Sequence, residues 1–166
     1  MAELTHKERL QPSLLDRITD ENPEQRSTVG VGRELSLSKL RDCVQRDLEW
    51  LLNSVNMEAS VDLSSYPEVA KSVLNYGMPD LAGHSASNID ASELERLVRQ
   101  AIWDFEPRIL RHTVRVHAAT DQDSMSQNTL VFEIAGDLWA HPVPLQIFLR
   151  TEVDLESGSV KITPSG

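Results

Sequence analysis

The chain has 166 residues, of which 40% are hydrophobic and 25% charged. This length is enough to bury a core in one domain without disulfide or metal support. The formal net charge of −10 at pH 7 argues against binding to nucleic acid, because phosphate backbones need a basic surface. With one cysteine, Cys43, and no stretch of roughly 18 apolar residues, we expect a cytoplasmic protein that does not insert into a membrane.

Residues 1–34 are predicted to form an N-terminal arm, and residues 35–166 the folded domain. The arm has one apolar cluster, Leu14, Leu15 and Ile18, which predicts a short amphipathic helix. The residues that follow it are polar and contain proline and glycine, as in a linker. Two alternatives stay open: a disordered arm, or a tethered peptide that docks on a partner or back on its own domain. In the second case Leu14 and Leu15 are candidate protein-binding residues.

The first long helix is predicted from Ser36 or Ser38 to about Ser54. Cys43 and Trp50 lie off its apolar stripe on a second face. Either the arm or a neighbouring helix covers that face, or Trp50 faces a partner. The stripe itself repeats at helical spacing and consists of Leu37, Leu40, Val44, Leu48, Leu51, Leu52 and Val55.

The segment that follows is less regular. Val61 and Leu63 alternate with polar residues and suggest a short strand. Pro67 at a first helical position predicts a helix over 68–75, and Gly77 is placed to end it with a positive φ angle.

The central helix is the best-defined element of the sequence. Asp90 is a natural N-cap, and Glu93 three residues later would complete a capping box. Pro107 requires the helix to end at or before Glu106. Its apolar stripe consists of Leu94, Leu97, Val98, Ala101, Ile102 and Phe105.

Alternating segments follow over about 111–119, 129–138 and from 145 onward, and Val160 and Ile162 allow a short last strand after a turn at Ser157 and Gly158. Helices first, then hairpin-connected strands, predict an α+β fold in which N-terminal helices pack on a small antiparallel-rich β-sheet.

The sequence offers little support for catalysis or for a cofactor. His112 and His117 lie five apart, on opposite faces of the predicted strand, and Cys43 has no second cysteine as a zinc partner, so no metal site is expected. Asp104 and Glu106 are the remaining pair, and they define the alternative of a peptidoglycan-cleaving glycoside hydrolase. Only 5% of the residues are aromatic, which disfavours a glycan site. We therefore expect no catalytic residues and no enzyme.

The Glu106-Pro107-Arg108 segment is the most informative candidate site. A carboxylate at a helix C-terminus is unfavourable by roughly 0.3–1 kcal/mol, and such an exception needs a reason. Either Glu106 and Arg108 form an internal ion pair that fixes the corner, or they form an outward polar epitope that recognises a partner. Trp103, on the charged face of the same helix, is a candidate interface anchor or is covered by another helix.

Several ordered motifs carry a family resemblance. They span residues 13–18, 46–53, 72–81, 106–109 and 150–158. Together they resemble TssE, the small baseplate subunit of bacterial type VI secretion systems, which belongs to the lysozyme-like baseplate wedge family of contractile phage tails.

The resemblance implies a structural, non-enzymatic subunit that contacts the wedge proteins TssF and TssG, with TssK as a further partner, and the sheath proteins TssB and TssC. It implies a fold shared with the part of the sheath protein that exchanges strands between neighbours. It also implies that Glu106, Pro107 and Arg108 form an assembly contact. We expect a sheet edge to start sheath assembly by strand addition.

Overall fold

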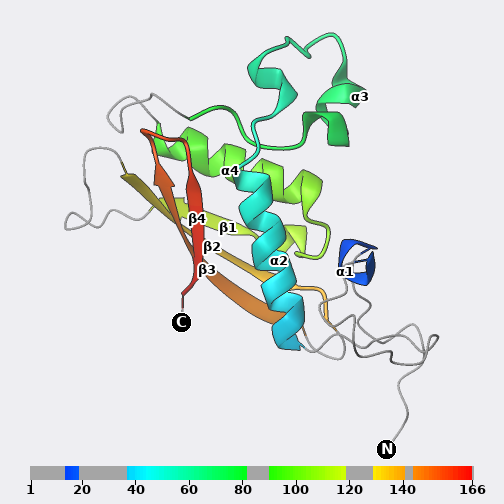
Figure 1. Cartoon of the computed structure of the whole chain (residues 1–166), viewed down its shortest axis with the longest axis vertical. Helices are drawn as coiled ribbons and strands as arrows, with labels where there is room; N and C mark the ends of the chain where they lie inside the picture. Colours follow the sequence, from blue (N-terminus) through cyan, green and yellow to red (C-terminus); the bar gives the residue numbers. More distant parts are fainter. Residues whose placement is uncertain (1–13, 19–36, 82–89, 119–128, 141–143, 166) are drawn as a thin grey trace, which may run out of the picture.

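The computed structural model describes residues 14–18, 37–81, 90–118, 129–140 and 144–165 (Figure 1). It has the predicted α+β fold, with two long helices on one face of a four-stranded sheet (Figure 1). The helices are α1 (Leu14–Ile18), α2 (Leu37–Leu52), α3 (Pro67–Ala70) and α4 (Ala91–Phe105). The strands are β1 (Arg115–Ala118), β2 (Thr129–Leu138), β3 (Leu145–Asp154) and β4 (Val160–Pro164).

The sheet is an antiparallel meander in the order β1-β2-β3-β4. Alternation along the strands decides which side chains face the helices. Val116 pairs with Ile134, and Ile134 with Leu149, so these buried side chains form one row across the sheet. Phe148, the next residue along β3, points to the other face and is exposed. The sheet therefore buries one face, against α2 and α4.

Both long helices bury the stripes that the sequence predicts. On α2 the central leucines, Leu48 and Leu51 among them, are buried, whereas the predicted ends of the stripe, Leu37 and Val55, are exposed. α4 packs over β1, and α2 over β4. None of the helices in the described ranges is long and apolar enough to cross a membrane.

Asp90 caps α4 as predicted, since its carboxylate accepts the Ser92 N–H at 2.9 Å. The second half of the capping box is different: the Glu93 side chain binds Arg96 at 2.6 Å.

The connection between α2 and α4 differs most from the prediction. No strand forms at Val61 and Leu63, and the predicted 68–75 helix is divided into α3 and a 3₁₀ turn, Val73–Asn75. The break follows from Ser72, whose hydroxyl accepts the Leu74 N–H, and from Asn75. The buried Asn75 amide donates to the Ala70 carbonyl at 2.9 Å and accepts the Glu58 N–H at 2.9 Å. Side-chain bonds of this kind replace helical ones.

Gly77 follows the 3₁₀ turn with a φ of +124°, a positive value as expected for a glycine that ends a helical segment. A Cβ atom there would lie 2.3 Å from the Ser54 carbonyl oxygen, so the position accepts glycine alone.

The first strand was predicted to start near Arg111 but starts at Arg115. Residues Arg111–Thr113 instead form a 3₁₀ turn. The Thr113 hydroxyl donates to the Leu110 carbonyl at 2.7 Å and accepts the Asp137 N–H at 2.9 Å, which holds the turn against β2.

Candidate functional site

The candidate site lies at the corner where α4 ends. Glu106 is the C-cap residue, and its N–H still bonds to the Ile102 carbonyl at 2.9 Å. Beyond Pro107, the Arg108 carbonyl accepts the Trp139 N–H at 2.8 Å, and this bond ties the corner to the end of β2. The corner is thus fixed on both sides of the proline, which itself is exposed.

Glu106 is buried, with an exposed fraction of only 4%. Its Oε1 accepts the Arg108 backbone N–H at 3.0 Å and the Arg108 Nε at 2.8 Å, while its Oε2 accepts Arg108 Nη2. A buried carboxylate needs such charge-assisted bonds, because burying it without a partner is costly. The unfavourable position at the helix C-terminus is therefore compensated by an arginine two residues away.

The ion pair continues through α2 to the N-terminal helix. Arg108 also binds Asp47, which accepts Arg46 Nη2 at 2.7 Å, and Arg46 binds Asp16 of α1 at 2.8 Å. We call this series of ion pairs, Glu106–Arg108–Asp47–Arg46–Asp16, the ion relay. Its two ends are its most buried side chains, whereas Arg108 is 24% exposed. Three segments far apart in sequence are joined by alternating charges.

The relay shifts several pKa values, among them those of Arg108 and Tyr76. Burial alone would lower the pKa of the Arg108 guanidinium. Its hydrogen bonds and charge interactions with Glu106, and then with Asp47, together outweigh burial, so the pKa lies above its ordinary value. Burial raises the pKa of Tyr76, and the negative charges of Asp47 and Glu106 add to this effect. Arg108 therefore stays protonated at any pH at which the protein is folded.

The two alternatives for the Glu-Pro-Arg segment can now be compared. Both oxygens of Glu106 are occupied by Arg108, and its carboxylate is buried, so this charge is not part of an outward epitope. The geometry favours the internal ion pair. What the corner presents outward is Pro107 and the partly exposed guanidinium of Arg108.

A groove of about 520 Å³ opens beside this corner. Leu15 of α1 contributes to its lining, and so do Trp50 of α2 and Pro107. Trp50 is 51% exposed and lies under the Arg46 guanidinium, 5.0 Å from the ring centre. The other residues that line the groove are Asp47, Leu51, Tyr76, Phe105, Glu106 and Arg108.

Trp50 is thus only partly covered, by Arg46, and about half of it stays exposed, where the sequence left both outcomes open. An exposed tryptophan beside a groove with apolar and charged walls is typical of a protein-docking surface rather than of a small polar substrate site.

Of the other predicted site residues, Leu15 reaches the groove, and α1 contacts α2 through Asp16. The side chain of Leu14 lies outside the described residues. Trp103, in the last turn of α4, is half-buried, and its indole N–H donates to the Arg111 carbonyl at 2.9 Å. Its role as a partner anchor stays a prediction, and it does not line the groove.

The two carboxylates proposed for glycoside hydrolysis serve different contacts. Asp104 accepts Gln100 Nε2 at 2.7 Å and pairs with Arg111 at 3.3 Å, whereas Glu106 belongs to the relay. A glycosidase needs a carboxylic acid and a carboxylate that both face the sugar. Glu106 instead directs both oxygens to Arg108, so this pair does not have the arrangement that the chemistry requires.

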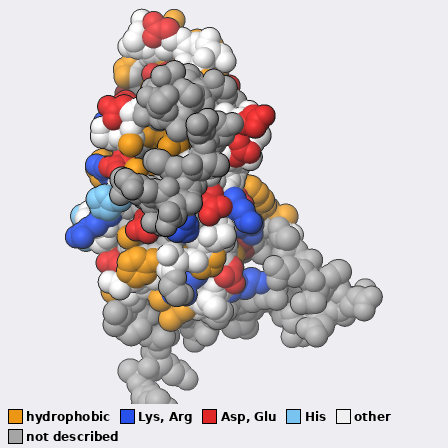
Figure 2. Space-filling view, turned by 90° about the vertical axis from the view of Figure 1, so that its left-hand side faces the viewer, with side chains coloured by type: hydrophobic (Ala, Val, Ile, Leu, Met, Phe, Trp, Pro, Cys, Tyr) orange, Lys and Arg blue, Asp and Glu red, His pale blue; other side chains and the backbone are white. Residues whose placement is uncertain are grey.

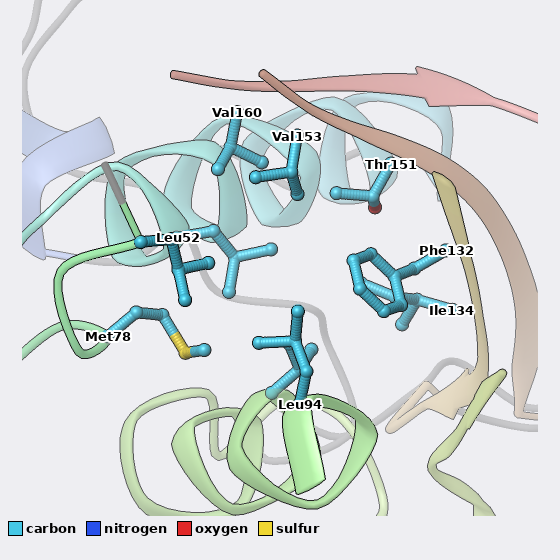
Figure 3. A pocket seen from close by; sticks show the side chains of 10 residues that line it. Leu52, Met78, Leu94, Phe132, Ile134, Thr151, Val153 and Val160 are labelled. Carbon is cyan, nitrogen blue, oxygen red and sulfur yellow. The ribbon is translucent and has the colours of Figure 1, made fainter. Parts of the chain in front are cut away.

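A second space lies in the interior, between the helices and the sheet (Figure 3). Its volume is about 10 Å³, which is the size of one water molecule. Among the described residues the buried Thr151 hydroxyl has no hydrogen-bond partner, and this side chain points toward the space from β3 (Figure 3). Apolar side chains such as Leu52 and Phe132 surround it, so it is a packing defect and not a substrate pocket.

The charged side chains on the described surface do not gather into a second candidate binding site. On the face drawn in Figure 2, basic side chains are interspersed with acidic ones and form no stripe. No cluster of three metal-ligating side chains occurs within the described ranges.

Comparison with known families decides the identity of the fold. The sequence model described as "Baseplate wedge protein gp25" matches residues 38–143, which is more than half of the chain and includes nearly all of α2, the whole of α4 and the corner. The chain belongs to this baseplate wedge family. The family gives the protein a structural role in a phage-tail-like baseplate. No curated protein and no solved structure matches the chain in the other two comparisons.

Within this baseplate wedge protein, residue-by-residue reasoning missed most of the relay. Arg46 and Asp47 belong to one of the motifs that carry the resemblance, and Asp16 to another, but none was singled out as a site residue. The available signal was a pair of opposite charges, Arg46 and Asp47, next to the buried stripe of an amphipathic helix. Nothing in their spacing connects them with Arg108, 61 residues away from Asp47.

Proposed function

We propose that this chain is the TssE-type baseplate subunit of a bacterial type VI secretion system. It acts in the cytoplasm as a non-enzymatic assembly protein. It contacts the wedge proteins TssF and TssG, with TssK as a further neighbour, and starts the contractile sheath of TssB and TssC by strand addition. The family membership supports the baseplate role, and the ordered motifs support the type VI assignment.

One observation carries the proposal. Residues from three separate motifs, Leu15, Trp50 and Pro107, line the same groove although they lie far apart in sequence. Residues that share neither a helix face nor a strand face are brought together by the ion relay, which fixes α1 and the corner on α2. A surface assembled in this way suits a protein partner, and we propose that the wedge docks here.

Trp50 has a matched control elsewhere on the chain. Trp139 is also a tryptophan, is 55% exposed, and does not line the groove. Its contact with the corner uses the backbone N–H, which an alanine substitution retains.

The test is co-purification of TssF and TssG with tagged protein from cells that express all three. Trp50→Ala is expected to reduce recovery at least about tenfold, the effect of losing one interface hot spot, while Trp139→Ala retains it. Equal recovery with both variants would exclude the groove as the wedge contact. Failure of the wild-type chain to recover either protein would exclude the type VI assignment.

A further inference from the structure

An open sheet has two edges, and an added strand needs backbone N–H and C=O groups that point away from the sheet. On β4 these are the groups of Val160, Ile162 and Pro164. The reason is that the alternate residues face β3: Ser159 accepts the Asp154 N–H at 2.9 Å, and Ser165 donates to Phe148 at 2.9 Å. On β1, which faces β2 through Arg115 and His117, the outward groups are those of Val116 and Ala118.

Side chains from α2 and from the residue after it occupy the β4 edge. The Asn53 amide accepts the Val160 N–H at 2.8 Å and donates to the Val160 carbonyl at 2.8 Å. These are the two bonds that a neighbouring strand would make at that residue. Gln45 donates to the Ile162 carbonyl at 3.1 Å, and Pro164 has no N–H to offer. Most of the outward groups of β4 are thus already used or missing.

The β1 edge is less occupied. The Ala118 N–H donates to the Glu95 carboxylate of α4 at 2.7 Å. Neither backbone group of Val116 is bonded on the outward side to any of the described residues. The side chains of Arg115 and His117 are exposed on the outer face of this strand.

We propose that β1 is the edge that accepts an added strand, and that Asn53 and Gln45 close β4. This inference rests on the proposed function, because it takes strand addition to the sheath as given. The chemistry of β1 defines the incoming segment: extended, apolar or small where it lies beside Val116, and acidic where it lies beside Arg115 and His117.

The test places a photo-cross-linking amino acid at His117 or at Lys161, one exposed position on each edge strand. The variants are assembled with wedge and sheath proteins and irradiated. We expect cross-links to sheath protein from His117 and background yield from Lys161. The opposite pattern would overturn the edge assignment but leave strand addition intact. Assembled complexes without a sheath cross-link from either position would overturn strand addition itself, and with it this inference.

A second arm tests the closure of β4. Asn53→Ala removes both bonds to Val160, and its fold is checked by circular dichroism. In a folded Asn53→Ala chain we expect Lys161 to gain cross-links, either to sheath protein or to a second copy of the chain. An unchanged background at Lys161 would show that Asn53 does not close this edge.

Discussion

The two long helices are held to the rest of the molecule in two different ways. Along most of their length, α2 and α4 bury aliphatic side chains against the sheet, and Leu48 and Ile102 are fully enclosed. At the end of α4, contact with α2 is made instead by charges, from Glu106 through Arg108 to Asp47.

The two kinds of contact have different roles, one in the stability of the domain and the other in the geometry of the groove. Apolar contacts are non-directional and supply most of the free energy of folding. Charged contacts are directional, and the buried charges of Glu106 and Asp16 depend on their arginine partners. We infer that the core holds the domain together, whereas the ion relay sets where Pro107 and α1 lie and so shapes the groove.

The largest effect is expected in the core. Leu48→Ala removes a fully buried side chain between α2 and the sheet, and should lower the free energy of unfolding by about 4 kcal/mol through lost burial and a cavity. Urea denaturation measures the loss. A change below about 1 kcal/mol would mean that α2 is not packed as described.

Arg108→Ala comes next. It leaves Glu106 buried without its partner, and because Arg108 is partly exposed we expect a loss of about 2 kcal/mol rather than the larger cost of a fully buried pair. The same denaturation experiment measures this loss. Wild-type stability in this variant would favour the outward-epitope hypothesis.

Asp16→Asn should leave global stability within about 1 kcal/mol of wild type, because Arg46 is partly exposed and keeps its ion pair with Asp47. It should nevertheless release α1 from α2, and trypsin cleavage after Arg17 measures that release. Added salt should have the same effect, because Arg46 is partly exposed to solvent. Asp42→Asn, an exposed change on α2, is the control, and faster cleavage in both variants would count against a specific contact.

The smallest effect concerns Tyr76, whose pKa is raised by burial and then by the charges of Asp47 and Glu106. Because the neutral phenol is favoured in the fold, its contribution to stability is present below the unfolded pKa of about 10 and is lost as pH rises through the folded value. Asp47→Asn should lower the pKa of Tyr76, measured by phenolate absorbance in a Tyr66→Phe background. An unchanged titration would place Asp47 too far away to act.

The same division explains how far the sequence could be interpreted. The N-cap of α4, its stripe and the alternation of the strands depend on near neighbours, so Asp90 and the buried positions from Leu94 to Ile102 were predictable. The structure of the connection between α2 and α4 was not predictable, because Asn75 replaces helical bonds with side-chain bonds to Ala70 and Glu58.

The residues of the corner at the end of α4 were predictable only in part. Glu106 stood out because its position breaks a local rule, and Arg108 lies two residues away, so an internal pair was one of two predictable outcomes. Asp47 and Asp16 were not predictable as partners, since such contacts are set by how the helices pack and not by any spacing along the chain.

The most direct test of the internal relay is a double-mutant cycle on its central pair. Glu106→Gln, Arg108→Met and the double variant are compared with the wild-type chain by urea denaturation. We predict a coupling free energy of about 2 kcal/mol, with the double variant less destabilised than the sum of the single changes. A coupling near zero, with both single variants as stable as wild type, would contradict the claim that Glu106 and Arg108 hold the corner from within.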